Sequence, residues 1–327
     1  MTFINKGACA ARLASTAATA LLLSSGALLA QDILAGVDLT KTCKIGFSQG
    51  TMNHPWRVAM VEGNKAWAAA NLPNVELIVT DGQNDSGKQV TDVESLMAQG
   101  VDVLMISPLT AQALTPIVQD VMAAGTPVVA LDRKVNAPVS YYITAQNIPI
   151  AQAAGEFFAK QLGGKGNIVE IEGTAGSSAA DERKSGFDGV IAQYPDMKII
   201  ATQNGDFLRE NAQKFMEDVL QRFGPGEIQG VYAHNDEMAF GALQALEAAG
   251  RADEVMVTGI DGQNNAIQAV ADGKLFATFT FPYVAPEGIQ YAYKACVDGA
   301  PAEQQDVILN FATIDQSNAK DWIGKGF

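Results

Sequence analysis

The side chains of this sequence that could do chemistry are carboxylates, guanidinium groups and an amide, and they recur just after short apolar runs. Asp132 and Arg133 follow the run Val128–Leu131, and Asn235 and Asp261 come at the ends of two later runs. Carboxylate oxygens accept hydrogen bonds from hydroxyl groups, and a guanidinium group donates in a planar fork that fits vicinal oxygens. An amide donates and accepts, as a hydroxyl group does. This set predicts binding of a polyhydroxylated small molecule.

Four more residues at comparable positions extend the predicted site. Arg183 lies one helical turn into the segment that follows the run Asn167–Ile171, and Arg57 comes soon after the first apolar run. Trp56 and Phe207 offer flat apolar faces to the C–H side of a sugar ring. A buried aspartate–arginine pair is costly unless every group is hydrogen-bonded, and a hydroxyl-rich ligand would satisfy it.

Each of these residues also has a purely structural interpretation. An aspartate after a strand can cap the next helix, an aromatic ring can belong to the core, and an arginine can be a solvated charge. We expect Asp236 to cap a helix and His234 to be a hydrogen-bonded histidine at a strand end. For the other residues, their coincidence at one edge of successive strands favours ligand binding, because ligands of open parallel sheets bind at the carboxyl ends of the strands.

The apolar runs alternate with amphipathic segments, as in β–α–β units with a parallel sheet. The first set of expected strands is Lys44–Ser48, Val75–Thr80, Val101–Ile106, Val128–Asp132 and Tyr141–Thr144. The second set is Asn167–Glu172, Lys198–Thr202, Gly230–His234, Val255–Ile260 and Leu275–Phe281. The expected helices include Trp56–Ala70, Lys88–Gln99, Ala111–Ala124 and Ala151–Leu162.

Two such sets predict an α/β protein with two doubly wound parallel-sheet lobes. The chain is expected to pass from one lobe to the other near Thr144–Asn147, directly after a strand. A last strand-like run, Val307–Thr313, is far in sequence from its expected partners. The chain is therefore expected to cross between the lobes more than once, which predicts a multi-strand hinge.

The first thirty residues have the pattern of a secretory signal. Lys6 and Arg12 precede an apolar, small-residue run from Ala17 to Ala30, and the first acidic residue is Asp32. The apolar run is shorter than the ~20 residues that a membrane span needs. We expect cleavage after Ala30, with Ala35 as the alternative, and export of a soluble protein to the periplasm.

The charge and cysteine content exclude several classes of function. A formal net charge of -14, from 22 basic and 36 acidic residues, disfavours nucleic-acid binding. Two histidines and three cysteines leave little material for a zinc site or a histidine-based triad, so we expect no metal and no cofactor. Once the signal is removed, Cys43 and Cys296 remain, and we expect two separate buried thiols, with a disulfide as the alternative.

Several segments, in order along nearly all of the exported chain, resemble one known family. They are Gly46-Phe47-Ser48, Asn53-His54-Pro55-Trp56, Leu131-Asp132-Arg133, Glu172-Gly173-Thr174-Ala175-Gly176, Ala179-Ala180-Asp181-Glu182-Arg183, Gly205-Asp206-Phe207, Ala233-His234-Asn235-Asp236-Glu237-Met238-Ala239 and Gly259-Ile260-Asp261-Gly262. In these segments the sequence is similar to the periplasmic sugar-binding proteins of the ribose/galactose type.

The resemblance implies a monosaccharide receptor of an ABC-type importer that binds its ligand in a cleft between the two lobes and closes on it. It implies three hinge crossings, a membrane permease as partner, a chemoreceptor as a further candidate partner, and a monomer. The lobes would comprise residues 36–145 with 282–308, and 146–281 with 309–327. Positions that contact sugar in the ribose-binding branch correspond here to Asp132, Arg133, Arg183, Asn235 and Asp261, with aromatic walls at Trp56 and Phe207.

The sequence departs from the ribose-binding branch at two places. Trp56 and Arg57 stand where that branch has two phenylalanines, and Phe281 stands where it has a glutamine near the last hinge. Trp56 and Arg57 look closer to the galactofuranose-binding branch. A furanose, another pentose or hexose, or a polyol therefore remains open as the ligand, and Phe281 joins the predicted ligand-binding residues.

Two other classes of function compete with a receptor. An exported glycosidase would use Asp132 and Asp261 as its carboxylate pair, but such an enzyme needs an acid of raised pKa beside a base. Each aspartate is instead expected to be held charged by an arginine or a backbone donor. A sugar-responsive repressor of the same fold would need a basic DNA-binding headpiece, whereas the N-terminus has the pattern of a signal.

Overall fold

The structure, a computed structural model, describes residues 33–327. The predicted signal of residues 1–30, with its cleavage site after Ala30, lies outside the described residues. Within residues 33–327, no helix combines the length and the apolarity needed to cross a bilayer. The same residues contain no cluster of three or more His, Cys, Asp or Glu side chains placed to hold a metal ion.

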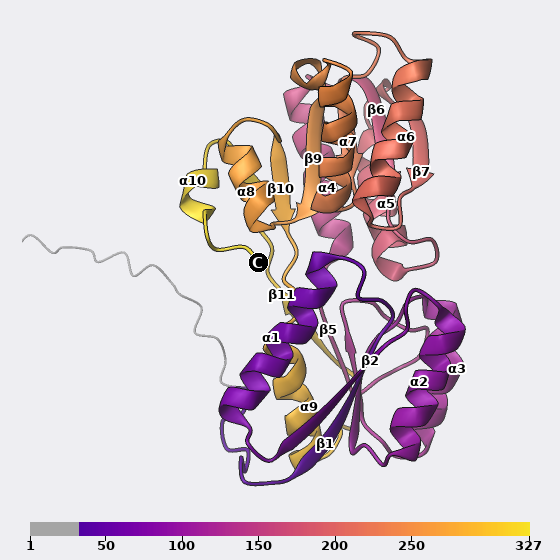
Figure 1. Cartoon of the computed structure of the whole chain (residues 1–327), viewed down its shortest axis with the longest axis vertical. Coiled ribbons are helices and arrows are strands. Elements are labelled where there is room, and N and C mark those ends of the chain that lie inside the picture. Colours follow the sequence, from indigo (N-terminus) through magenta and orange to yellow (C-terminus); the bar gives the residue numbers. More distant parts are fainter. Residues whose placement is uncertain (1–32) are drawn as a thin grey trace, which may run out of the picture. The chain divides into compact units, whose positions relative to one another are not determined.

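Strands and helices alternate along the chain and build two sheets, which confirms the predicted α/β class (Figure 1). The first sheet has six strands, all parallel, in the order β11-β5-β4-β3-β1-β2. Its strands are β1 (Cys43–Gln49), β2 (Val75–Asp81), β3 (Val103–Ser107), β4 (Val128–Leu131), β5 (Tyr141–Ala145) and β11 (Gln305–Leu309). Its helices are α1 (Pro55–Asn71), α2 (Ser86–Ala98), α3 (Ala111–Ala123) and α9 (Glu287–Asp298).

Helices cover both faces of the first sheet, so its central strands are buried on both sides. Helices α1 and α9 pack on one face, and α2 and α3 pack on the other (Figure 1). Ile45 and Phe47 of β1 join the core under α1 and α9. Gly46 faces the opposite way, where a Cβ would lie 3.1 Å from Leu96 of α2. Burial on two faces explains why β3 and β4 are almost continuously apolar in sequence.

The second sheet also has six strands, in the order β12-β10-β9-β8-β6-β7, and β12 is its one antiparallel member. Its strands are β6 (Lys165–Glu172), β7 (Asp196–Asn204), β8 (Gly230–Ala233), β9 (Met256–Asp261), β10 (Ala277–Thr280) and β12 (Thr313–Asp315). Its helical segments are α4 (Asn147–Gln161), α5 (Ser178–Ile191), α6 (Arg209–Arg222), α7 (Asp236–Ala248), η1 (Ala252–Glu254), α8 (Asn264–Ala271) and α10 (Ala319–Trp322). Helices α4 and α5 pack on one face, and α6, α7 and α8 pack on the other.

The chain passes between the two sheets three times. The crossings follow β5, β10 and β11. The prediction of a single strand over Val307–Thr313 was wrong, because that run contains the third crossing. Its first half extends β11 of the first sheet, and Thr313 begins β12 of the second sheet. An apolar run does not reveal that its two ends pair with different sheets.

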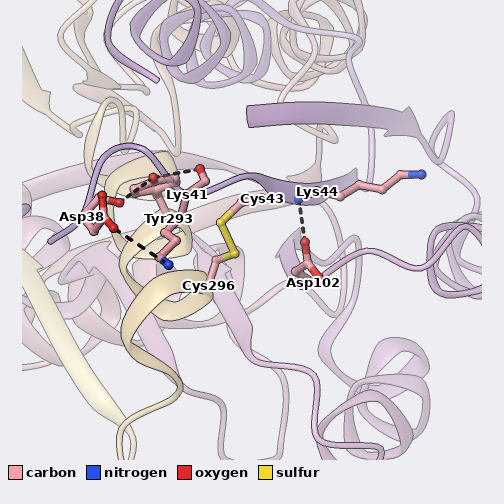
Figure 2. Close-up of a disulfide and its surroundings, with 7 residues drawn as sticks. All are labelled: Asp38, Lys41, Cys43, Lys44, Asp102, Tyr293 and Cys296. Atoms are coloured by element: carbon pink, nitrogen blue, oxygen red, sulfur yellow. Dashed lines mark hydrogen bonds and ion pairs between the residues drawn. A yellow bond between two sulfur atoms is a disulfide. The ribbon is translucent and has the colours of Figure 1, made fainter. Parts of the chain in front are cut away.

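A disulfide joins Cys43, the first residue of β1, to Cys296 near the end of α9 (Figure 2). The Cα atoms lie 6.3 Å apart, within the range that a disulfide spans. The expectation of two separate buried thiols was therefore wrong. The two residues are 253 positions apart in sequence, and they meet because α9 returns to the first sheet and packs against β1.

The helix that carries Cys296 is also fastened to the segment before β1. The hydroxyl group of Tyr293 donates to the carbonyl oxygens of Asp38 and Lys41, at 2.9 and 3.0 Å (Figure 2). On the other side of the disulfide, the backbone N–H of Lys44 donates to Asp102 Oδ2 at 2.7 Å. The disulfide and Tyr293 thus fasten α9 to the start of β1 and to the segment before it, and Asp102 fastens β1 to the segment before β3.

Candidate functional site

One cavity is lined by residues from the carboxyl ends of both sheets. About 260 Å³ of space there is free of protein atoms, and part of that space is open to solvent. Its lining residues are His54, Trp56, Arg57, Asp132, Arg133, Ala179, Arg183, Phe207, Asn235, Asp261 and Phe281. We call the space bounded by these residues the intersheet cavity. The structure brings all nine residues that the sequence predicted for ligand binding to this one place.

The two sheets contribute to the lining in the same way, through the segments that come after their strands. The first sheet places residues after β1 and after β4, namely His54, Trp56, Arg57, Asp132 and Arg133. The second sheet places residues after β6, β7, β8 and β10 and at the end of β9, namely Ala179, Arg183, Phe207, Asn235, Phe281 and Asp261. Parallel strands direct all their carboxyl ends to one edge, which is why residues so far apart in sequence converge.

Arg57 is held by three partners on the first sheet. Its Nη2 lies 2.8 Å from Asp132 Oδ2, and its Nη1 donates to Gln49 Oε1 at 3.0 Å and to Ser107 Oγ. The side chains of Arg57 and Asp132 are 2% and 4% exposed. Burial lowers the pKa of Arg57, and the neighbouring Asp132 carboxylate opposes that change. This pair is the kind of buried charge that needs a full set of hydrogen bonds.

Arg133 lies beside this pair and is anchored to a loop of the same sheet. Its Nη1 donates to the carbonyl oxygen of Leu109 at 2.7 Å, and its Nε lies 3.8 Å from Asp132 Oδ2. Burial lowers the pKa of Arg133, and the Arg57 guanidinium group adds to that effect. The backbone of Asp132 has φ 63, a left-handed conformation that aspartate tolerates better than most residues.

Arg183 is the guanidinium group of the second sheet. Its Nε donates to Asn147 Oδ1 at 2.9 Å, and its Nη1 donates to the carbonyl oxygen of His234. The same Nη1 lies 3.9 Å from Asp261 Oδ1. Burial raises the pKa of Asp261 well above its usual range, and Arg183 opposes that change. Arg183 thus lies beside Asp261, but burial outweighs it, which goes against the expectation that this aspartate is held charged.

Asn235 caps helix α7, and the expected cap at Asp236 was wrong. Asn235 Oδ1 accepts from the N–H of Met238 at 2.9 Å, and its Nδ2 donates to the carbonyl oxygen of Phe207 at 3.2 Å. Asp236 is the first residue of the helix itself, and its carboxylate accepts from Thr278 Oγ1 and from the N–H of Gln263. An amide and a carboxylate cap equally well, so the sequence alone did not distinguish the two neighbours.

His234 is a hydrogen-bonded histidine at a strand end, as predicted. Its Nδ1 accepts from the N–H of Gly173 at 3.2 Å, and its Nε2 lies 3.1 Å from Glu170 Oε1. The ring is fully buried, and it does not line the intersheet cavity. Its backbone carbonyl oxygen is the atom that contributes to the site, because it accepts from Arg183.

Aromatic rings cover the guanidinium groups. Phe207 lies 5.5 Å from the guanidinium carbon of Arg133 and 5.7 Å from that of Arg183. Phe281 lies 4.6 Å from the guanidinium carbon of Arg183, and its ring centroid is 5.4 Å from that of Trp56. The indole N–H of Trp56 donates to the carbonyl oxygen of Phe281 at 2.9 Å. Phe281, on a segment that crosses between the sheets, is thus held by a residue from each sheet.

The position of Phe207 depends on a glycine. A Cβ at Gly173 would lie 2.0 Å from Phe207 Cζ, closer than any real contact. Asp206 and Phe207 both have left-handed backbone conformations, with φ 55 and 62. Glycine at position 173 therefore makes room for the ring that reaches the cavity.

His54 also lines the cavity, and the sequence analysis did not assign it a role. It is 8% exposed, and neither ring nitrogen makes a hydrogen bond with any described residue. Burial lowers the pKa of His54 well below its usual range, and the guanidinium groups of Arg57, Arg133 and Arg183 lower it further. The imidazole is therefore neutral at pH 7 and can both donate and accept. The one sequence feature that could have predicted its place at the cavity is its position just before Pro55 and Trp56.

Several polar atoms around the cavity have no hydrogen-bond partner among the described residues. They are both ring nitrogens of His54 and the Nε atoms of Arg57 and Arg133. A buried donor without a partner costs about 1–3 kcal/mol, so native proteins rarely leave several together. Their concentration at one place indicates a site that is completed by a ligand rich in hydrogen-bonding oxygens.

The sequence matches a family of known proteins over most of its length. The model of the periplasmic binding protein domain family matches residues 45–299. The chain is 38% identical to the ribose import binding protein of Bacillus subtilis over 239 residues, which are 73% of this chain and 76% of the relative. It is 36% identical to the galactofuranose-binding protein of Escherichia coli over 253 residues, 75% of this chain and 79% of the relative.

A solved structure gives the same result. The crystal structure of a galactofuranose-binding protein is similar to this chain with a TM-score of 0.81 and 31% sequence identity. The similarity covers 87% of this chain and 98% of that protein. Sequence and backbone therefore point to the same group of proteins.

Proposed function

Because the chain belongs to the periplasmic binding protein family, we propose that it is the sugar receptor of an ABC-type importer and that it binds a monosaccharide in the intersheet cavity. One observation carries the proposal. Two carboxylates, three guanidinium groups and three aromatic rings, drawn from both sheets, converge on that cavity. The two relatives reported above bind ribose or galactofuranose by their names, and the same chemistry is proposed here.

The chemistry of the lining fits a ring with several hydroxyl groups. Asp132 and Asp261 accept from hydroxyl groups, and the guanidinium groups donate to vicinal oxygens. Trp56 and Phe207 offer apolar faces to the C–H side of the ring. His54, with two unpaired ring nitrogens, is added to the nine proposed ligand-binding residues. A micromolar Kd corresponds to about -8 kcal/mol, which a handful of charge-assisted hydrogen bonds can supply.

Binding is proposed to close two lobes on the sugar without changing it chemically. The lobes are residues 36–145 with 282–308, and residues 146–281 with 309–327. A ligand that touches both lobes favours the arrangement in which they face each other, by its differential affinity for that arrangement. The closed form, a monomer in the periplasm, would then be recognised by the membrane permease or by a chemoreceptor.

A ligand screen tests this function. Thermal melting of the purified chain is measured with ribose, arabinose, galactose, fructose, apiose, xylitol and myo-inositol, and each sugar that raises the Tm is then titrated by calorimetry. We expect one or a few of them to bind with a stoichiometry of one. Galactose is included because its solutions contain some of the furanose form. Failure of every member to bind would overturn the sugar-receptor proposal.

A second assay tests the absence of chemistry. The chain is incubated with aryl glycosides, and release of the aryl group is followed over hours. We expect none, because the matching relatives are named as binding proteins. Sustained release that disappears in an Asp132→Asn variant would favour a glycosidase over a receptor.

A further inference from the structure

Gln89 is a polar residue on the buried side of an otherwise apolar helix face. It is completely buried in α2, whose other fully buried side chains are Val93 and Leu96. It does not line the intersheet cavity. Burying an amide is costly unless its hydrogen bonds are made, so an apolar residue is the usual choice at such a position.

All the hydrogen-bonding groups of this amide are used at the carboxyl ends of β1 and β3. Nε2 donates to the carbonyl oxygen of Ser107 at 3.1 Å and to Ser48 Oγ at 3.3 Å. Oε1 accepts from the N–H of Leu109 at 2.8 Å. A backbone N–H can only donate and a carbonyl oxygen can only accept, so the orientation of the amide is fixed by its partners.

The same partners hold the two guanidinium groups of the first sheet. The carbonyl oxygen of Leu109 accepts from Arg133 Nη1 at 2.7 Å, and Ser107 Oγ accepts from Arg57 Nη1. Gln89 is thus hydrogen-bonded both to Leu109, which binds Arg133, and to Ser107, which binds Arg57. Arg183 is outside this network, because its partners Asn147 and His234 belong to the second sheet.

The close packing around Gln89 leaves the amide little freedom. A Cβ at Gly82 would lie 3.0 Å from Gln89 Cβ and 2.9 Å from the carbonyl oxygen of Gly50. The N–H of Gly50 donates to the carbonyl oxygen of Ser107, the same oxygen that accepts from Gln89. The amide is therefore seated in a notch between three strand ends.

We propose that Gln89 is a positioning residue for the ligand site, which sets the geometry of Arg133 through Leu109 and of Arg57 through Ser107. The role in sugar affinity rests on the proposed function, whereas the effect on the two guanidinium groups does not. A purely structural role would lower the stability of the first sheet and leave the guanidinium groups and the ligand affinity of the folded protein unchanged. The two roles can therefore be told apart by measuring the two guanidinium groups and the ligand affinity in the folded protein.

The first test observes the arginines directly and needs no ligand. The side-chain Nε–H signals of Arg57, Arg133 and Arg183 are assigned in the ¹⁵N-labelled full chain by single Arg→Lys replacements. In Gln89→Leu we expect the signals of Arg57 and Arg133 to shift or broaden and that of Arg183 to stay. Gln89→Met, which keeps the length of the side chain and loses every hydrogen bond of the amide, should disturb the same two signals and leave that of Arg183 unchanged.

Gln229→Leu is the matched control. That amide also ties a backbone N–H, of Asn167, and a carbonyl oxygen, of Gly226, but at the other end of the second sheet. It should leave all three signals unchanged. Unchanged Arg57 and Arg133 signals in both Gln89 variants, or an equal disturbance of Arg183, would overturn the proposal. If Gln89→Leu does not fold, Gln89→Met, which is closer to glutamine in shape, decides.

The second test measures affinity with the sugar that the screen identifies. Gln89→Leu should weaken binding about tenfold at unchanged stoichiometry, because two guanidinium groups lose their geometry, while Gln229→Leu should weaken it less than about twofold. Undiminished affinity in a folded Gln89→Leu chain would overturn the role in binding. If the wild-type chain binds no sugar, the proposed function fails, and the arginine spectra still decide the role of Gln89.

Discussion

At the scale of single residues, the site consists of charges that burial would make unfavourable and that neighbouring groups stabilise. Arg57 and Asp132 pair within the first sheet, and Arg183 faces Asp261 within the second. Removing one member of such a pair leaves the other buried without a partner, and this is costlier than removing both. Single substitutions in the lining should therefore have large effects on binding.

Asp132→Ala and Arg183→Ala are each expected to cost more than ~1.5 kcal/mol of sugar affinity, which is more than about tenfold. Calorimetric titration of the two variants measures this. Arg209→Ala is the control, because Arg209 pairs with Glu237 away from the cavity. Wild-type affinity in both lining variants would place the ligand elsewhere.

Asp236 should make the stability depend on pH. Burial raises its pKa to about 7, from an ordinary value of 3.8. The folded chain therefore holds this proton more tightly than the unfolded chain, and stability is lost as the pH rises from about 4 to about 7. Asp236→Asn removes this titration and the effect of Asp236 on the raised pKa of Asp261, so between pH 5 and 8 the wild type should lose more stability than the variant.

Urea unfolding at pH 5, 6, 7 and 8 measures that difference. His54 and His234 have lowered pKa values, so they act in the opposite sense, and only below about pH 6.5. Both histidines are present in the wild type and in the variant, so their contributions to the pH dependence of stability cancel in the comparison. Parallel curves for the wild type and Asp236→Asn would mean that the carboxylate is already charged at pH 5.

At the scale of elements, the sequence predicted those features that depend on burial pattern and missed those that depend on long-range geometry. The apolar runs located the strands because helices cover both faces of each sheet. The same pattern did not show that Val307 and Thr313 belong to different sheets. Nor did it show that Cys43 and Cys296 meet, because a separation of 253 residues carries no information about distance.

The candidate site was predictable because ligand-binding residues of parallel sheets gather at the strand ends. Nine lining residues were predicted from their positions near the carboxyl ends of strands and from the family resemblance, and all nine lie at the cavity. His54 was missed because a single histidine before a proline has no distinctive spacing. Gln89 was missed because its importance depends on hydrogen bonds to the ends of two separate strands, β1 and β3, which only the folded structure brings together.

The loop between β6 and α5 provides a prediction at this scale. Gly173→Ala should displace Phe207, because the new Cβ would overlap its ring, and sugar affinity should fall by about tenfold or more. The matched control is Gly189→Ala in α5, where a Cβ meets no atom within 4 Å and alanine favours the helix. Calorimetry and thermal melting of both variants measure the effects. Equal affinities in the two variants would contradict the role given to Gly173.

At the scale of the whole molecule, the two sheets are linked by polar contacts beside the cavity as well as by the crossings. Lys134, next to Arg133, pairs with Glu182, next to Arg183. The N–H of Lys134 also donates to Ser178 Oγ at 3.2 Å. These contacts join the two halves of the lining directly, so their strength contributes to the stability of the arrangement that holds a ligand.

Lys134→Met and Glu182→Gln should each weaken sugar affinity about twofold, as expected for a partly exposed ion pair. The double variant should lose little more than either single variant, and the effects should shrink in about 0.5 M salt. Lys294→Met is the control, since Lys294 pairs with Asp298 inside α9. If the losses of sugar affinity in the two single variants add up in the double variant and do not change with salt, the ion pair does not couple the two halves of the lining.

The disulfide closes a covalent ring from Cys43 to Cys296, and that ring contains every strand of the second sheet except β12. A protease that cuts once inside it, for example in the exposed turn at residues 225–227, therefore releases no fragment. The cut chain should run as one band near full length on a gel without reductant, and as two bands after reduction. A cut receptor would keep both halves of its binding site, held together through sulfur.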